Sequence, residues 1–270
     1  MFSNSIYATT TFFVAVILFC LAIIFGLGSK KHSPRSFAFA IVLTAFWVSC
    51  TGTAYLFWGR DDILTALFIR GGYFFGTVIP FAVFYFALTY PDNYKPPVFI
   101  RAIFISAGIL TALFYFAKDM VSFFGTSTAI TFSEQTVVGE VFKTSNGYLG
   151  WYPGKHIIFF FIFFFGSFCA ALSALWQKYK QQTDPTHKKE TLYMFWAMTT
   201  GFIPAGIFNC IFPFYGIFAL YWPGIIATLG WVCIIGYSVI KENQMNVMTV
   251  TSELLVIILI LLMFIGMFAV

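Results

Sequence analysis

The chain has 270 residues, of which only 9% are charged and 60% are hydrophobic. A soluble domain usually carries about 25% charged residues, so the composition excludes an ordinary soluble protein and indicates an integral membrane protein. The formal net charge is +5. Because the basic residues lie in short segments between apolar runs, they are typical of membrane-topology signals and not of a nucleic-acid-binding surface.

The first part of the sequence predicts four membrane-spanning helices, because about 20 apolar residues cross the core of a bilayer. The predicted spans are Thr9–Gly28, Phe37–Trp58, Leu67–Tyr90 and Phe99–Ala117. No Lys or Arg precedes the first apolar run, so this run is expected to be an uncleaved anchor and not a secretory signal. In the third span, Gly72 and Gly76 favour close helix packing, and Pro80 is expected to bend the helix.

The segment from Lys118 to Lys155 is the one long polar connection, and it contains a predicted β-hairpin. The strands are expected at Thr136–Thr144 and Tyr148–Tyr152, on either side of Ser145-Asn146-Gly147. Asn-Gly supplies the positive φ angles that a type I′ turn requires, and β-branched and aromatic residues flank it.

The second part of the sequence predicts further spans at His156–Gln177 and Leu192–Phe214, separated by a polar loop at Lys178–Glu190. A seventh span occupies the apolar part of Gly216–Val250, which closes at Lys241 and Glu242. An eighth apolar run begins near Thr251 and continues to Val270. We therefore expect a seven-helix transmembrane domain over residues 1–250 and the start of an additional helix over 251–270, in the front part of a longer protein.

The Lys and Arg residues predict the orientation in the membrane. If the connections after the first, third, fifth and seventh spans are cytoplasmic, that side holds ten of the fifteen basic residues, and the other side holds five. Because cytoplasmic loops carry the excess of Lys and Arg, the N-terminus and the hairpin are expected to be extracytoplasmic, in a multi-pass protein of the plasma membrane.

Three residues are candidate ligand contacts: Arg70, Asn209 and Trp222. Arg70 lies near the outer end of the third span, where it could anchor the helix, pair with Asp61 or Asp62, or contact a ligand at the mouth of the bundle. Asn209 lies mid-span between Pro204 and Pro213, where an interhelical hydrogen bond is the alternative to ligand binding.

Trp222 lies at the outer end of the seventh span, beside an expected pocket. It also fits an outer belt of aromatic residues at the membrane interface, together with Trp58, Tyr73, Trp151, Tyr152 and Tyr221.

Catalytic and metal-binding motifs are not found in the sequence. It contains no GxSxG or HExxH motif, and its five cysteines lie in apolar runs without CxxC spacing, which is typical of packing residues. We therefore expect no enzyme activity, no metal and no cofactor in these residues.

The order of several segments resembles a known family, the N-terminal seven-helix sensory region of bacterial membrane-bound sensor histidine kinases. The matching segments are AFWVSCTGTAYL (Ala45–Leu56), IRGGYFFGTVIPFAVFYFALTYP (Ile69–Pro91), the hairpin, the KKE loop, the span with Asn209, and GYSVIKENQMNVMTV (Gly236–Val250). The resemblance implies an input module of a two-component signalling protein. It would pass a stimulus through the helix bundle to a kinase output domain, in cis or in a partner protein, with a homodimer as the expected assembly.

Two other functions stay open at this point. A small transporter or channel could use the same bundle, although the spans contain few charged or strongly polar residues for a polar solute. An intramembrane enzyme acting on lipid would need clustered His, Asp or Glu residues, which the spans lack. The composition does not indicate what the stimulus is, although apolar walls favour an apolar or lipid-like ligand.

Overall fold

Long apolar helices dominate the computed structural model, which describes residues 4–28, 31–91, 95–103, 105–111, 138–143, 149–154, 157–218 and 221–242. Within these residues, five helical segments are long and apolar enough to cross a membrane. They belong to α1 (Asn4–Leu27), α2 (His32–Phe57), α3 (Asp62–Thr89), α5 (Ile157–Gln181) and the segment Pro185–Phe214. This architecture agrees with the prediction of an α-helical membrane bundle.

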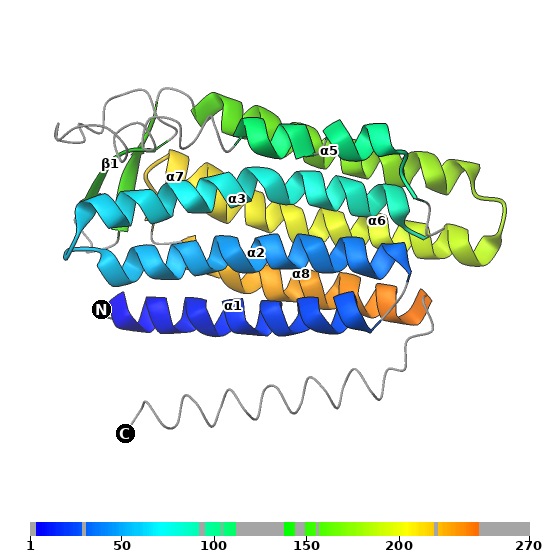
Figure 1. Cartoon of the computed structure of the whole chain (residues 1–270), viewed down its shortest axis with the longest axis horizontal. Helices are drawn as coiled ribbons and strands as arrows, with labels where there is room; N and C mark the ends of the chain where they lie inside the picture. The colour runs from blue at the N-terminus through cyan, green and yellow to red at the C-terminus, as the bar shows by residue number, and fades with distance from the viewer. Residues whose placement is uncertain are drawn as a thin grey trace, which may run out of the picture.

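The helices form a ring. The segment Pro185–Phe214 consists of α6 (Pro185–Gly206), the π-helix η1 (Ile207–Ile211) and the short α7 (Phe212–Phe214), and α8 (Tyr221–Glu242) follows. Along the ring, α1, α2, α3, α5, α6 and α8 each pack against the next, and α8 closes the ring by contacting α1 and α2. Figure 1 shows these helices side by side along their length.

The two ends of the bundle differ in character. The N-terminus, the strands and α7 lie at one end, here called the sheet end (Figure 1). The opposite end carries the connections after α1, α3 and α5, and is here called the basic end. There the charges of Arg35, Lys95 and Arg101 all act on His32, and Lys178 donates hydrogen bonds to the carbonyl oxygens of Leu88 (2.7 Å) and Tyr90 (2.5 Å).

The helices extend into residues that the sequence predicted to be loop. The predicted loop Lys178–Glu190 is wrong in its length, since α5 continues to Gln181 and α6 begins at Pro185. Asp184 caps α6 by accepting from the backbone N–H of Thr186 (3.4 Å) and of His187 (3.2 Å), and a proline at the first helical position is compatible with a helix start. Asp61 likewise caps α3 by accepting from Leu64 N–H at 2.9 Å.

Two short strands pair at the sheet end. β1 (Val138–Lys143) runs antiparallel to β2 (Leu149–Pro153). β1 lies within the segment expected to be the first strand, and β2 ends one residue beyond the second. A two-residue turn at Asn146-Gly147 would place Lys143 opposite Gly150, but Lys143 lies opposite Leu149. The observed register therefore does not fit a two-residue turn; residues 144–148 themselves lie outside the described part of the chain.

The remaining predicted spans are described to different extents. Residues 99–103 and 105–111 of the fourth predicted span are helical and belong to a shorter apolar helix. α8 lies within the seventh predicted span, but its described apolar part, Ala227–Ile240, is shorter than the five segments that are long enough to cross a membrane. The eighth predicted span, from Thr251, lies outside the described residues.

Aromatic side chains fill the core towards the basic end. Phe37 of α2 packs against Phe25 of α1 and Phe86 of α3, with ring centroids 5.2 Å apart in both pairs. It also contacts Trp231 of α8, with a centroid distance of 6.3 Å. A hydrogen bond of 2.7 Å between the hydroxyl groups of Ser36 and Thr89 joins α2 to α3 in the same region.

Candidate functional site

A cavity of about 80 Å³ lies inside the helix ring. Its walls come from α2, α3, α5, α6, η1 and α8, and strand β2 contributes Leu149 and Trp151. One buried water needs about 10–15 Å³, so the space suits several waters or one small molecule. The site is therefore formed by elements from both ends of the sequence.

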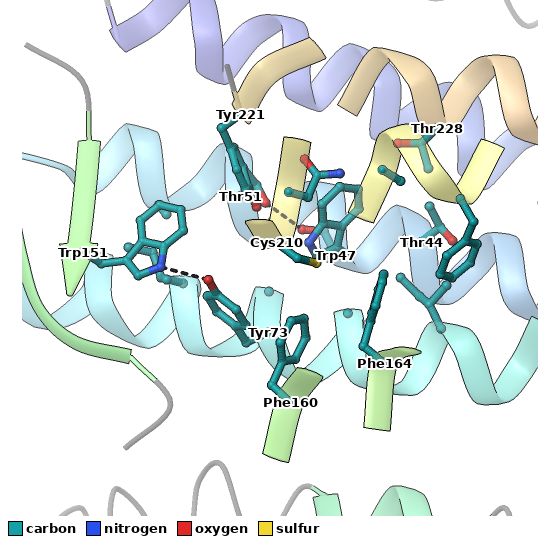
Figure 2. Close-up of a pocket in the computed structure, with 18 of the residues that line it drawn as sticks. Thr44, Trp47, Thr51, Tyr73, Trp151, Phe160, Phe164, Cys210, Tyr221 and Thr228 are labelled. Atoms are coloured by element: carbon teal, nitrogen blue, oxygen red, sulfur yellow. Dashed lines mark hydrogen bonds between the residues drawn. The ribbon is translucent and has the colours of Figure 1, made fainter. Parts of the chain in front are cut away.

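Aromatic rings make up much of the cavity wall. They are Trp47, Tyr55, Tyr73, Trp151, Phe160, Phe164, Phe202, Tyr221 and Trp231. In Figure 2, Phe160 and Phe164 rise from α5 towards the cavity, opposite Trp47 and Thr51. Such walls favour a flat, apolar occupant that can stack on rings or meet their edges.

Trp151 covers the cavity at the sheet end. Its indole Nε1 donates a 2.9 Å hydrogen bond to the hydroxyl of Tyr73 on α3 (Figure 2). Its ring also packs against Phe218 and Tyr221, with centroid distances of 4.8 and 5.5 Å. The predicted place of Trp151 and Tyr221 in an interfacial belt is wrong, since only 5% and 8% of these residues is exposed. β2 carries Trp151 across the end of the ring, and there both rings face inward.

Hydroxyl groups lie on the α2 and α8 sides of the cavity. Thr44 donates to the carbonyl of Ala40 at 2.8 Å, and Thr228 donates to that of Gly224 at 2.8 Å. The Tyr221 side chain interacts with those of Thr51 and Trp47, as the closeness of the three in Figure 2 illustrates. Most hydroxyl groups of the wall are thus engaged within the protein.

Two polar atoms of the wall are not engaged in this way. Asn209 Oδ1 and Trp231 Nε1 are buried and have no hydrogen-bond partner among the described residues. Leaving such a group unpaired costs about 1–3 kcal/mol, and most buried polar groups in proteins are paired. Both atoms therefore carry this cost within the described part of the chain.

Glycines provide the space for these two side chains. A Cβ atom at Gly224 of α8 would lie 2.2 Å from Asn209 Oδ1, and one at Gly201 of α6 would lie 1.9 Å from Trp231 Cδ1. Real Cβ atoms essentially never make contacts this short. The two glycines thus allow the Asn209 amide and the Trp231 indole to lie against the neighbouring helix.

A π-helix places Asn209 in the wall. In η1, the N–H of Phe212 bonds to the carbonyl of Ile207, five residues earlier. Pro204 and Pro213, which lie on either side, lack the N–H groups that a regular helix would use. π-Helical turns of this kind are frequent at functional sites, and this one presents Asn209 and Cys210 to the cavity.

The three predicted ligand contacts differ in where the structure places them. Asn209 lines it. Arg70 is buried in α3, with 3% of the residue exposed, but it is not among the described lining residues, although its neighbours Ile69 and Gly72 are. Trp222 lies in the first turn of α8 next to the lining residue Tyr221, and its side chain lies outside the described part.

Sequence reasoning missed most of the wall. Trp231, Trp47 and Thr51 were not proposed as site residues, and neither were the glycines Gly201 and Gly224. One signal was present: Trp47 and Thr51, like Gly72 and Gly76, are four residues apart, so each pair lies on one helix face. The contacts between Gly201 and Trp231 and between Gly224 and Asn209 depend on the register of α6 against α8, which no local pattern encodes.

The wall is uncharged in the described part of the chain, since none of the described lining residues is Asp, Glu, Lys or Arg. The described residues also contain no group of three or more His, Cys, Asp or Glu side chains that could hold a metal ion. The chemistry that this wall offers is hydrogen bonding and aromatic packing. A comparison with protein-family models gave no match, and a comparison with curated proteins gave none either.

Proposed function

We propose that this chain is the membrane input module of a signal-transduction protein, in which the packing around the cavity responds to a stimulus. The observation that carries the proposal is the cavity itself, which lies where α2 and α3 meet α5, α6, η1 and α8. A ligand shifts a conformational equilibrium only if it binds one packing better than the other. An occupant of this cavity contacts both sides of the ring and therefore favours one separation of the two sides.

The C-terminal part of the ring provides the means to move. η1 lies between Pro204 and Pro213, where the helical hydrogen-bond ladder is already interrupted. Kinks and shifts in helices concentrate at prolines and π-helical turns. α8 contacts α6 and η1 at one side and runs to the basic end, so a shift at η1 has a direct route to that end.

The proposed topology places the basic end in the cytoplasm. Arg35, Lys95 and Arg101 gather near His32 at this end, which agrees with the excess of positive charge in cytoplasmic loops. The N-terminus and the strands are then extracytoplasmic, in a plasma-membrane bundle of seven spans with an eighth at the C-terminal side. A kinase output domain, in cis or in a partner protein, would receive the signal, and a homodimer is the proposed assembly.

A small transporter or channel is the alternative, and the polar atoms inside the cavity are the observation that favours it. An uncharged wall suits only a neutral solute, because a charged one would lose its hydration without gaining a partner. Purified protein in liposomes separates the two functions: a transporter releases an entrapped solute that crosses through it, and an input module retains the solute.

A chimera tests the signalling proposal. Residues 1–242 are joined to the dimeric kinase part of a characterised sensor kinase, and phosphorylation of its response regulator is measured in cells. Gly76→Leu introduces a large side chain into the cavity wall. A Cβ atom at this position would lie 3.5 Å from the Phe160 ring. Gly166→Leu is the matched control on α5, because nothing lies within 4 Å of a Cβ at this exposed position.

The proposal expects Gly76→Leu to change the phosphorylation level at least threefold, while Gly166→Leu leaves it within the spread of repeat measurements. Equal phosphorylation in both variants, at equal membrane abundance, would contradict the proposed function.

A further inference from the structure

A groove runs between α6 and α8, and it shares no described lining residue with the central cavity. Its volume is about 1130 Å³, whereas a pocket for a drug-sized ligand has roughly 300–1,000 Å³. α6 begins and α8 ends at the basic end (Figure 1), and the groove lies towards that end. It is therefore large enough for a ligand that enters from the surrounding membrane.

The character of the groove changes along its length. At the basic end, its wall includes Thr186, Lys189 and Glu190 from the first turns of α6. Further along, apolar and aromatic side chains line it, chiefly Trp196 of α6 and Ile234 of α8, of which 55% and 51% is exposed. A polar end followed by an apolar channel matches a molecule with a polar headgroup and hydrocarbon chains.

The length of the apolar part favours a lipid over another helix. Glu190 is the charged lining residue nearest to this part, and Thr200 is the described lining residue of α6 furthest from the basic end. Ten residues of helix separate them, which is about 15 Å along the axis. The hydrocarbon core of a bilayer is about 30 Å thick, so this part extends through one leaflet. A second copy of the chain, or a further membrane-spanning segment, would need a surface about twice as long.

Lys189 supplies a positive charge at the polar end. Its side chain is exposed, and its Nζ lies 5.9 Å from the centre of the Tyr193 ring, which also lines the groove. Two neighbouring carboxylates are engaged within the protein, since Glu190 Oε2 lies 3.2 Å from His187 Nδ1 and Asp184 caps α6. The charge of Lys189 is therefore accessible to an anion at the mouth of the groove.

We propose that this groove binds an anionic phospholipid from the leaflet at the basic end. The phosphate group contacts the Lys189 ammonium, since basic pockets between membrane helices attract anionic headgroups. An acyl chain lies along Trp196 and Ile234 and covers apolar surface that the bundle alone leaves exposed. The inference depends on the membrane location of the bundle and not on the signalling proposal.

Native mass spectrometry of the full chain, released from detergent micelles in the presence of lipid, tests the inference. The probes are dioleoyl phosphatidylglycerol, which is anionic, and dioleoyl phosphatidylcholine, which has the same chains and no net charge. We expect the first phosphatidylglycerol molecule to bind about fivefold more tightly than phosphatidylcholine, the effect of one lysine at an anionic membrane surface. Glycerol phosphate, which offers the phosphate group without the chains, is expected not to compete.

Two lysine variants assign the headgroup contact. Lys189→Gln removes the charge beside the groove and is expected to reduce the preference for phosphatidylglycerol to below about twofold. Lys188→Gln is the matched control, because the Lys188 Nζ lies 5.1 Å from the centre of the Tyr179 ring of α5 and Lys188 is not among the described lining residues. We expect this control to keep the fivefold preference. An equal loss in the two variants would indicate a general attraction to the basic end and would overturn the inference.

Two cysteine variants assign the acyl-chain contact. Cys233→Phe places a ring in the apolar part of the groove, since Cys233 is an exposed lining residue of α8, and is expected to weaken phosphatidylglycerol binding about tenfold. Cys169→Phe is the matched control, because Cys169 is an exposed residue of α5 and is not among the described lining residues. Size-exclusion chromatography shows that each variant is folded. If a cysteine variant does not fold, the two exposed lysine variants still decide.

Three further results would overturn the inference: equal affinities for the two phospholipids, competition by glycerol phosphate, or unchanged binding in both Lys189→Gln and Cys233→Phe. A dimer that dissociates in Cys233→Phe, without any lipid preference, would assign the groove to a second copy of the chain and would overturn it as well.

Discussion

Helices α1 to α3 and the elements from α5 to α8 pack to different degrees, although they form one ring. In the most apolar part of each span, 67% of the residues of α2 and 50% of those of α3 are buried, against 33% for α5 and 28% for Pro185–Phe214. α1 to α3 also contain no π-helical residue in their described parts, whereas η1 interrupts the C-terminal half. We infer that α1 to α3 act as a fixed frame against which the C-terminal half can move.

The largest expected effect concerns the tightest contact within the looser half. Gly201→Ala places a methyl group 1.9 Å from Trp231 Cδ1, so the indole and α8 must shift. Overpacking of this kind costs about 1–3 kcal/mol. We expect a lower unfolding midpoint in a denaturant titration of the detergent-solubilised protein.

Gly230→Ala is the matched control on α8, where a Cβ has nothing within 4 Å, and it is expected to unfold like the unsubstituted protein. If Gly201→Ala unfolds at the same midpoint as this control, α6 and α8 do not pack closely around Trp231, and the cavity wall is described wrongly.

A smaller effect is expected at the hydrogen bonds that join α5 to the end of α3. Lys178 of α5 donates to the carbonyl oxygens of Leu88 and Tyr90 at the end of α3. Lys178→Met keeps the aliphatic chain but removes both donors. Because hydrogen bonds from a charged group contribute about 1.5–3 kcal/mol, and part of this is lost to solvent at a half-buried site, we expect a loss of about 1–2 kcal/mol in the same titration.

Lys180→Met is the matched control for the Lys178 hydrogen bonds, since Lys180 is exposed and lies two residues further along α5. Its expected change is below about 0.5 kcal/mol, as is usual for surface residues. If the two substitutions lower the free energy of unfolding equally, the Lys178 hydrogen bonds do not hold α5 against α3.

The smallest effect is expected inside the fixed frame. Thr89→Val removes the 2.7 Å hydrogen bond between the hydroxyl groups of Thr89 and Ser36. Interhelical hydrogen bonds in membrane proteins average about 0.6 kcal/mol, and the surrounding helices keep their aromatic packing. We expect a loss of that order.

Thr200→Val on α6 serves as the reference for this prediction, because among the described residues the Thr200 hydroxyl bonds within its own helix, to the carbonyl groups of Trp196 and Ala197. A loss above about 2 kcal/mol for Thr89→Val would indicate that the frame depends on this bond and not on its packed rings.

The sequence predicted the helices better than it predicted the site. Runs of about 20 apolar residues identify a span by composition alone, so the segments that became α1, α2, α3, α5 and Pro185–Phe214 were all predicted near their observed positions. The ends were less accurate because polar residues at the basic end continue the helices, and the capping role of Asp184 before Pro185 was not recognised.

The cavity could be predicted only in part. Asn209 was predicted because it lies mid-span between two prolines, whose missing N–H groups and displaced carbonyl groups leave backbone atoms in need of partners. Trp231 and Trp151 were not, because their roles depend on contacts between distant segments: Trp231 with Gly201 across α6 and α8, and Trp151 with Tyr73 across β2 and α3. Arg70 illustrates the reverse case, since an intramembrane charge attracts a functional interpretation, while the structure buries it and does not include it among the described lining residues.

Pulsed EPR distance measurement tests the central claim most directly, namely that filling the cavity moves the C-terminal half against the frame. Spin labels are attached to Lys31→Cys before α2 and to Thr183→Cys between α5 and α6, both exposed at the basic end, after the five native cysteines have been replaced. The account predicts that Gly76→Leu shifts the mean distance by about 1–2 Å, the usual size of helix shifts in switching proteins, while Gly166→Leu leaves it unchanged. Superimposable distance distributions for the two variants would contradict the account.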